Sequence, residues 1–182
     1  MKKTILLLIT FFTLNSCNKD DNPFSGSDKL PPETQTGANT AGCLLNGKVF
    51  LPHQEGLSPA LVCNYEFIDE EFYFNIHFSD RRGTDVKAIA VQTRTINLQA
   101  GQTYTLDKNT IDNGDFIGGG GQYYISSFLN KNYYTNTIKT GELKITRIDL
   151  SNSIISGTFW FDAVNQAGEV VEIREGRFDM EY

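Results

Sequence analysis

The chain has 182 residues, which is enough for about one domain. A hydrophobic fraction of 40% and a charged fraction of 21% allow a buried core and exclude a globally disordered chain. The formal net charge of -6 argues against nucleic-acid binding, which requires a basic face. With only two histidines and three cysteines, multi-ligand zinc and iron–sulfur centres are nearly excluded. We therefore expect no nucleic-acid partner, no metal site and no cofactor.

The N-terminus has the pattern of an export signal. Two lysines precede an apolar run at residues 5–14, which is shorter than the roughly 20 residues of a membrane-spanning helix. The run ends in Leu14-Asn15-Ser16-Cys17, which resembles a bacterial lipobox, although Asn15 stands where a smaller residue is usual. We expect residues 1–16 to be a lipoprotein signal peptide and Cys17 to carry the lipid. The alternative is an ordinary secretory signal with an incidental cysteine.

The residues after Cys17 bear on localisation. Lys19, Asp20 and Asp21 resemble the export signal that directs lipoproteins of Bacteroidota-type envelopes to the cell surface. We expect an outer-membrane protein, anchored by its lipid and facing the cell exterior; the alternative is a solvated charge run at the head of a linker. Residues 17–41, rich in Asn, Asp, Ser, Gly, Thr and Pro, are expected to form the lipidated cysteine and a flexible tether. Because so acidic a chain is repelled by anionic headgroups, its contact with the membrane would come through the lipid.

From residue 42 to residue 182 the sequence alternates in the manner of β-strands. Apolar and polar positions alternate cleanly between residues 72 and 78, where four apolar side chains share one face and His77 lies on the other. Asp69-Glu70 is expected to be a hairpin turn before this strand, and Asn46-Gly47 suits a type I′ turn. No window shows sustained helical spacing. These patterns predict an all-β fold: a single antiparallel β-sandwich or open barrel of about eight to nine strands, after the signal peptide and the linker.

The middle of the domain contains an unusual run of glycines. Residues 112–121 are expected to form a mobile hairpin loop that ends in four glycines at positions 118–121; no Lys-Ser or Lys-Thr follows, so the run is not a phosphate loop. Oxygen ligands of the kind that Ca²⁺ takes occur nearby, but their spacing does not match an EF-hand, and we assign no metal to them. These residues are Asp107, Asn109, Asp112, Asn113 and Asp115. An Asn-rich polar stretch with Tyr133 and Tyr134 follows.

Two irregularities are expected in the C-terminal third. Leu143 and Ile145 share a face, but Ile148 is out of phase with them, which predicts a β-bulge near Arg147. Gly176 is expected to break the register of the last strand.

Residues 42–50, 155–159 and 176–179 resemble the two ends of a family of uncharacterised Bacteroidota lipoproteins, and the stretch before Gly42 is similar to the same family. The resemblance implies a surface lipoprotein and transfers no catalytic residue.

The cysteines beyond the anchor are Cys43 and Cys63. Both lie in strand-like runs, and the compartment is oxidising, so a disulfide is expected; the alternative is two buried free thiols. Neither histidine lies in a recognisable catalytic context, and no serine occupies a nucleophile elbow. We therefore assign no catalytic residue and expect a protein that is not an enzyme.

Aromatic residues on polar faces are the best indication of a binding surface for sugar rings or a protein partner. The alternative is that half of them fill the interior. The candidates are Tyr73, Tyr123, Tyr124, Tyr133, Tyr134 and Trp160. Our first interpretation is a non-enzymatic module for binding or scaffolding. One alternative is a lipocalin-like carrier of a small apolar or glycan ligand, and another is a hydrolase.

Overall fold

The computed structural model describes residues 29–111, 116–126 and 131–182. The expected lipidation site, Cys17, and the expected export signal, Lys19, Asp20 and Asp21, lie outside these ranges. Within them, no helix is long and apolar enough to cross a membrane.

The described chain is all-β, as predicted, but it has eleven strands instead of eight or nine, and its sheet is mixed. The extra strands are short ones that the sequence pattern does not separate from loops. The strands are β1 (Thr40–Leu45), β2 (Lys48–Phe50), β3 (Leu61–Ile68), β4 (Glu71–Asp80), β5 (Lys87–Arg94), β6 (Thr103–Leu106), β7 (Gly118–Ile125), β8 (Asn132–Tyr134), β9 (Gly141–Asp149), β10 (Ile154–Val164) and β11 (Val170–Glu181). Along the sheet their order is β2-β1-β11-β10-β9-β6-β7-β5-β4-β3.

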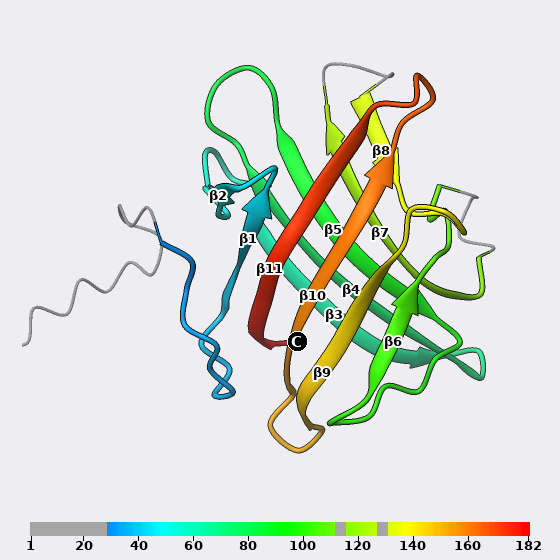
Figure 1. Ribbon diagram of the computed structural model, residues 1–182. Helices are drawn as coiled ribbons and strands as arrows, with labels where there is room; N and C mark the ends of the chain where they lie inside the picture. The colour runs from blue at the N-terminus through cyan, green and yellow to red at the C-terminus, as the bar shows by residue number, and fades with distance from the viewer. Residues whose placement is uncertain (1–28, 112–115, 127–130) are drawn as a thin grey trace, which may run out of the picture.

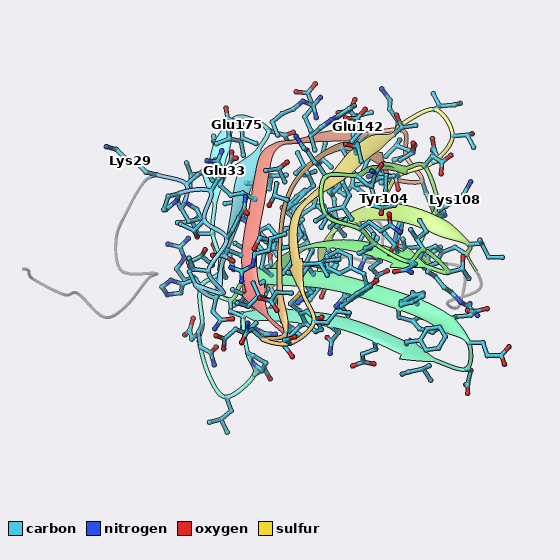
Figure 2. The ribbon with its side chains drawn as sticks, turned by 90° about the horizontal axis from the view of Figure 1, so that it is seen from below. Lys29, Glu33, Tyr104, Lys108, Glu142 and Glu175 are labelled. Carbon is cyan, nitrogen blue, oxygen red and sulfur yellow. The ribbon has the colours of Figure 1, made fainter. Side chains whose placement is uncertain are left out.

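The sheet folds into two layers that cross each other (Figures 1 and 2). A front layer holds β1, β11, β10 and β9, and a rear layer holds β7, β5, β4 and β3. Between the layers, β6 pairs antiparallel with β9 and parallel with β7, and β8 pairs with both β7 and β10. With β2 and β3 at the two ends of the strand order, the architecture agrees with the expected sandwich or open barrel.

Aromatic side chains fill the space between the layers. Phe74, Ile76 and Phe78 of β4 are buried as the period-two pattern predicts. They meet aromatic residues of the front layer: the ring centroids of Phe74 and Phe178 lie 5.7 Å apart. The ring centroids of Phe78 and Phe159 lie 6.3 Å apart. The interior is therefore a packed core that holds the two layers together.

The predicted turns and bulges are confirmed. Asn46 and Gly47 between β1 and β2, and Asp69 and Glu70 between β3 and β4, all have positive φ, as type I′ turns require. The β9–β10 register shifts between the partners Arg147 and Ile145. The β10–β11 register also shifts, between the partners Gly176 and Ile173, so that Trp160 lies opposite a bulge.

The run of four glycines is a strand and not the expected loop. Residues 118–121 begin β7, which pairs with β5 along its whole length. A Cβ on Gly121 would lie 2.7 Å from the Phe161 ring in the core, and one on Gly120 would lie 2.5 Å from the backbone oxygen of Lys108 on the opposite face. Both sides of the strand are thus approached too closely for a side chain, and this explains why a glycine run can be a strand.

Part of the expected tether belongs to the folded domain. Residues 34–38, here called the strap, hydrogen-bond to Asp179 of β11 from their backbone and hydroxyl groups. Asp179 is 1% exposed, and Ser156 donates to it from the neighbouring strand at 2.7 Å. The sequence did not predict these contacts, because the strap bonds to a carboxylate about 140 positions further along the chain. A contact over that separation produces no local sequence pattern.

The expected disulfide is absent. Cys43 and Cys63 are free thiols and both are buried. Cys43 lies on β1 and Cys63 on β3, and these strands are not hydrogen-bonded neighbours. Burial raises the pKa of the Cys63 thiol to about 12 and raises that of Cys43 as well. Both residues therefore serve as apolar core side chains.

Candidate functional site

The six aromatic residues expected to form a binding surface do not lie together. Tyr123 and Tyr133 face the core, each 6% exposed, with their rings 5.6 Å apart, so these two were wrongly assigned to the surface. Tyr73 and Tyr124 lie on the outer face of the rear layer, where Tyr124 shares a hydrogen bond of 3.1 Å with His77. Trp160 lies on the front layer. Tyr134 is half-buried and lines a cavity.

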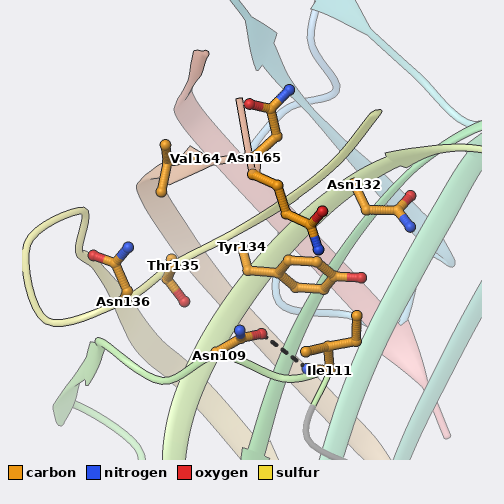
Figure 3. A pocket seen from close by; sticks show the side chains of 9 residues that line it. Asn109, Ile111, Asn132, Tyr134, Thr135, Asn136, Val164 and Asn165 are labelled. Atoms are coloured by element: carbon orange, nitrogen blue, oxygen red, sulfur yellow. Dashed lines mark hydrogen bonds between the residues drawn. The ribbon is translucent and has the colours of Figure 1, made fainter. Parts of the chain in front are cut away.

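That cavity, here called the amide pocket, has a volume of about 240 Å³. It forms where β8, the end of β10 and the segment after β6 meet. Its lining residues are Asn109, Ile111, Asn132, Tyr134, Thr135, Asn136, Val164, Asn165 and Gln166. Figure 3 shows the Tyr134 ring at the centre of the group. Asn132 and Asn165 lie on one side of the ring, and Asn109 and Ile111 lie on the other.

Some of the polar groups in the amide pocket shape the backbone. The side-chain oxygen of Asn109 accepts from the backbone N–H of Ile111 at 3.0 Å, the bond drawn in Figure 3. The oxygen of Asn136 accepts from two N–H groups, those of Ile138 and Lys139. Asn165 accepts from the turn that follows it. These amides hold local turns, as Asn often does in loops.

Other polar groups in the amide pocket have no hydrogen-bond partner within the described residues. They are the Tyr134 hydroxyl, the whole side-chain amides of Asn132 and Gln166, and the amide N–H₂ groups of Asn109 and Asn136. Burial raises the pKa of Tyr134, so its hydroxyl remains a protonated donor at neutral pH. The pocket therefore offers several donors, with amide oxygens as acceptors, around one aromatic ring.

Surrounding contacts fix the pocket walls. The Oε2 atom of Glu169 accepts from Asn165, Tyr133 and Lys131 at 2.7 to 3.0 Å, which joins β8 to the β10–β11 turn. Hydrogen bonds from Lys131, Asn165 and Tyr133 lower the pKa of Glu169, so this carboxylate stays charged. The buried hydroxyl of Thr135 donates to the backbone oxygen of Lys108 at 2.6 Å. Hydrogen bonds within the protein therefore fix the positions of the pocket walls.

The chemistry of the lining limits the ligand. None of the lining side chains carries a charge, and a charged ligand buried there would lack a partner. The volume is below the range of about 300–1,000 Å³ that drug-sized ligands occupy. Amide groups both donate and accept, as a hydroxyl does, and an aromatic ring can stack on an apolar ring face. A small, neutral ligand rich in hydroxyl groups fits these conditions.

Trp160 lines a separate groove on the front layer. Its indole N–H donates to Glu142 at 3.2 Å, and the guanidinium of Arg174 lies 5.5 Å from the ring centroid. Glu33 and Glu175 also line this groove, and Figure 2 shows both, with Glu142, on the outer face of the front layer. Arg177 pairs with Glu33 at 3.8 Å and with Glu175 at 3.3 Å. All three carboxylates are therefore engaged with other side chains.

His77 lies on the face of β4 opposite to the buried Phe74 and Phe78, as the alternation predicts. In the described part of the chain, no group of three or more His, Cys, Asp or Glu side chains suited to a metal gathers. Of the oxygen ligands considered for Ca²⁺, Asp112, Asn113 and Asp115 lie outside the described residues. Asp107 pairs with Lys108 at 3.2 Å, and Asn109 lines the amide pocket.

Sequence reasoning identified Tyr134 as a candidate but missed Asn132 and Gln166. The Asn-rich composition of residues 130–136 was the available signal, since amides are common in loops and recognition sites alike. Gln166 comes from a turn after β10 and gives no signal in the sequence.

A family model described as a domain of unknown function (DUF6252) matches residues 82–180, more than half of the chain. All nine residues of the amide pocket lie within the matched region, whereas β1 to β4 precede it. No curated protein and no solved structure matches the chain.

Proposed function

The chain belongs to the DUF6252 family of domains of unknown function, and we propose that it is a non-enzymatic binding protein whose amide pocket takes a neutral sugar. One observation carries this proposal: polar groups without protein partners surround the Tyr134 ring in a cavity that has no charged side chain. These groups belong to exposed or half-buried residues, and a hydroxyl-rich ligand can form direct hydrogen bonds with them in place of water.

The geometry supports a sugar over other small polar ligands. A sugar ring presents an apolar face of C–H groups and an edge of hydroxyl groups. The Tyr134 ring offers a surface for the face, and the amides of Asn132 and Gln166 offer donors and acceptors for the edge. The pocket volume of about 240 Å³ suits a ligand of about one ring.

Calorimetric titration of the purified protein with glucose, galactose, mannose and N-acetylglucosamine tests the proposal. We expect at least one to bind, and Tyr134→Ala to weaken that binding by at least about tenfold, which is 1.4 kcal/mol. Tyr134→Phe, which keeps the ring, should lose less. Gln102→Ala is the matched control, because Gln102 is an exposed amide outside the pocket. Binding by none of the four sugars, or undiminished binding by Tyr134→Ala, contradicts the proposal.

The proposal also places this module at the cell surface. The lipobox-like sequence at Cys17 and the charges at Lys19, Asp20 and Asp21 support a lipid-anchored outer-membrane protein that faces the exterior, of the Bacteroidota lipoprotein type that the chain resembles. Cys17→Ala should abolish fatty-acid labelling, and external protease should degrade the protein on whole cells. Retained label excludes Cys17 as the lipidated residue, and protection from protease indicates that the protein faces the periplasm.

A carrier of an apolar ligand is the second candidate, and one groove favours it. A groove of about 480 Å³ lies beside β3 and the end of β11, with Leu61, Met180 and Tyr182 among its lining residues. The interior between the layers is filled by aromatic rings, so this groove is the place where such a ligand would bind. A rise in melting temperature with added fatty acid would support a carrier; an unchanged melting temperature would argue against it.

A hydrolase has less support. Glu33, Glu142 and Glu175 share the Trp160 groove, but each is already paired with another side chain.

A further inference from the structure

We infer that the sugar-binding site continues across the rear layer into a second pocket, so that the ligand is a linear, neutral oligosaccharide. This inference rests on the proposed function of the amide pocket and names the class of its ligand. The second pocket has a volume of about 340 Å³ and lies over β3, β4 and β5, with Asn64, Tyr73, Asn75, Gln92 and Phe116 among its lining residues.

A short segment forms the wall between the two pockets. Asn109 and Ile111 line the amide pocket, whereas Thr110 lines the second pocket. We call residues 108–111 the ridge. The hydroxyl of Thr110 donates to Gln122 at 3.3 Å, and the backbone oxygen of Lys108 accepts from Thr135 at 2.6 Å. The ridge is therefore bonded to both β7 and the segment after β8, and a ligand that crosses it meets a fixed surface.

Strand register places both pockets on one face of the rear layer. Gln92 is opposite Gly120 of β7, and Tyr134 is opposite Gln122, two residues further along the same strand. With strands about 4.8 Å apart and about 3.3 Å per residue, Gln92 and Tyr134 lie roughly 12 Å apart along this face. One sugar ring does not reach across that distance, and a chain of rings does.

The second pocket repeats the chemistry of the amide pocket. Asn64, Asn75 and Gln92 are aligned cross-strand neighbours on β3, β4 and β5. One bond in this row joins two of its members, from the Gln92 N–H₂ group to the Asn75 oxygen at 3.2 Å. The Asn64 oxygen, the Asn75 N–H₂ group and the Gln92 oxygen have no partner in the described part of the chain. Amides that lack partners thus lie in both pockets.

The second pocket also has aromatic rings, as the amide pocket does, and its charged lining residue is paired. Tyr73 and Phe116 line the second pocket as Tyr134 lines the first. Its one cationic lining residue, Arg94, bonds to Glu71 at 2.8 Å and lies 5.5 Å from the Tyr73 ring centroid. Because that charge is balanced by its neighbour, the surface favours a neutral ligand over an anionic one.

The test is a chain-length series measured on the purified protein. The probes are the α-gluco-, β-gluco-, manno- and N-acetylchito-oligosaccharides, each from the single sugar to the hexasaccharide. For the series that binds, we expect affinity to rise by at least about tenfold between the single sugar and the longer chains, because a second pocket then contributes without a second loss of translational freedom. Affinity should then level off.

Variants separate the two pockets. Asn75 lies in the second pocket and not in the amide pocket. We therefore expect Asn75→Ala to remove most of the chain-length gain and to leave single-sugar binding in the amide pocket unchanged. Tyr134→Ala should weaken binding at every length. Gln102→Ala serves as the control, because Gln102 is exposed and lies outside both pockets. Melting curves of each variant show whether it is folded.

The outcomes separate this inference from the proposed function. Equal affinity for short and long chains, with single-sugar binding that Tyr134→Ala weakens, overturns the second pocket and leaves the amide pocket standing. A chain-length gain that Asn75→Ala does not reduce also overturns it. Binding by no sugar of any length overturns both.

Discussion

The carboxylate of Asp179 holds Thr36 by two hydrogen bonds, from its backbone N–H at 2.9 Å and from its hydroxyl at 3.2 Å. Thr34, Gly37 and Ala38 add further donors to the same carboxylate. One acidic side chain on the last strand thus fastens the segment that precedes the first strand. Burial opposes ionisation of Asp179, but these hydrogen bonds outweigh it and hold its pKa well below the ordinary range.

Asp179→Ala should release the strap and lower the free energy of unfolding by about 3 kcal/mol, because hydrogen bonds to a charged group are the stronger kind. Urea unfolding measures the loss, and hydrogen exchange at Thr36 and Gly37 shows whether the strap is released. Glu55→Ala, an exposed acid outside these contacts, is the control. Unchanged exchange at both amides in Asp179→Ala would contradict the account.

The same carboxyl makes stability depend on acid pH. Because its folded pKa lies below the unfolded value of about 3.9, the unfolded state binds more protons over that window. Its contribution is therefore complete above about pH 5 and is lost progressively as the pH falls past about 3.9 toward the folded pKa. Wild type should lose more stability between pH 5 and pH 3 than Asp179→Ala; equal losses would contradict this.

His77 predicts a second pH dependence nearer neutrality. Burial and the nearby charge of Arg81 lower its pKa below 6.5. The unfolded state thus binds the proton first, so stability is present above about pH 6.5 and falls as the pH drops toward the folded pKa. His77→Gln should flatten the decline in urea midpoint between pH 7 and pH 5. A variant with the wild-type slope would show that His77 does not contribute.

The two core cysteines should be inert in the folded protein. Burial raises the pKa of Cys63 to about 12 and also raises that of Cys43. Almost no thiolate therefore forms at about pH 8. We expect iodoacetamide to leave both unmodified in the native protein and to label both, without reductant, in urea. Peptide mapping identifies the labelled sites. Failure to label either residue in urea would indicate the disulfide that the structure lacks.

The sequence predicted those parts of the fold that have a local signature. The alternation around Phe74 and Phe78 gave β4, the phase change near Arg147 gave the bulge in β9, and Asn46-Gly47 gave the first hairpin. A glycine run has no side chains to alternate, so β7 gave no period-two pattern.

The binding surface was harder to predict. Tyr123 and Tyr124 are adjacent on one strand and so face opposite sides, as do Tyr133 and Tyr134. Which tyrosine of each pair faces the core depends on the pairing of β7 with β5 and β8, which sequence alone does not give. The amide pocket also needs Gln166, which the fold brings to β8 from a later turn.

Gly120→Ala should disturb both the fold and the site. Its Cβ would lie 2.5 Å from the backbone oxygen of Lys108, beneath the ridge, and backbone cannot move aside as a flexible side chain can. We expect a loss of about 1–3 kcal/mol in urea unfolding and weaker sugar binding. Gly101→Ala is the comparison for backbone strain without a clash, since no atom lies within 4 Å of its Cβ but its φ of 83° opposes the change. A Gly120→Ala variant as stable as wild type would contradict the close approach.

The most direct test of the amide pocket is nuclear magnetic resonance of its side-chain N–H₂ groups. In a titration with the single sugar that binds most tightly, the account predicts that the N–H₂ signals of Asn132, Gln166 and Asn109 shift together, with one dissociation constant. The Gln102 N–H₂ signal should stay in place. Shifts confined to groups outside the pocket, or no shift at saturating sugar, would contradict the central claim.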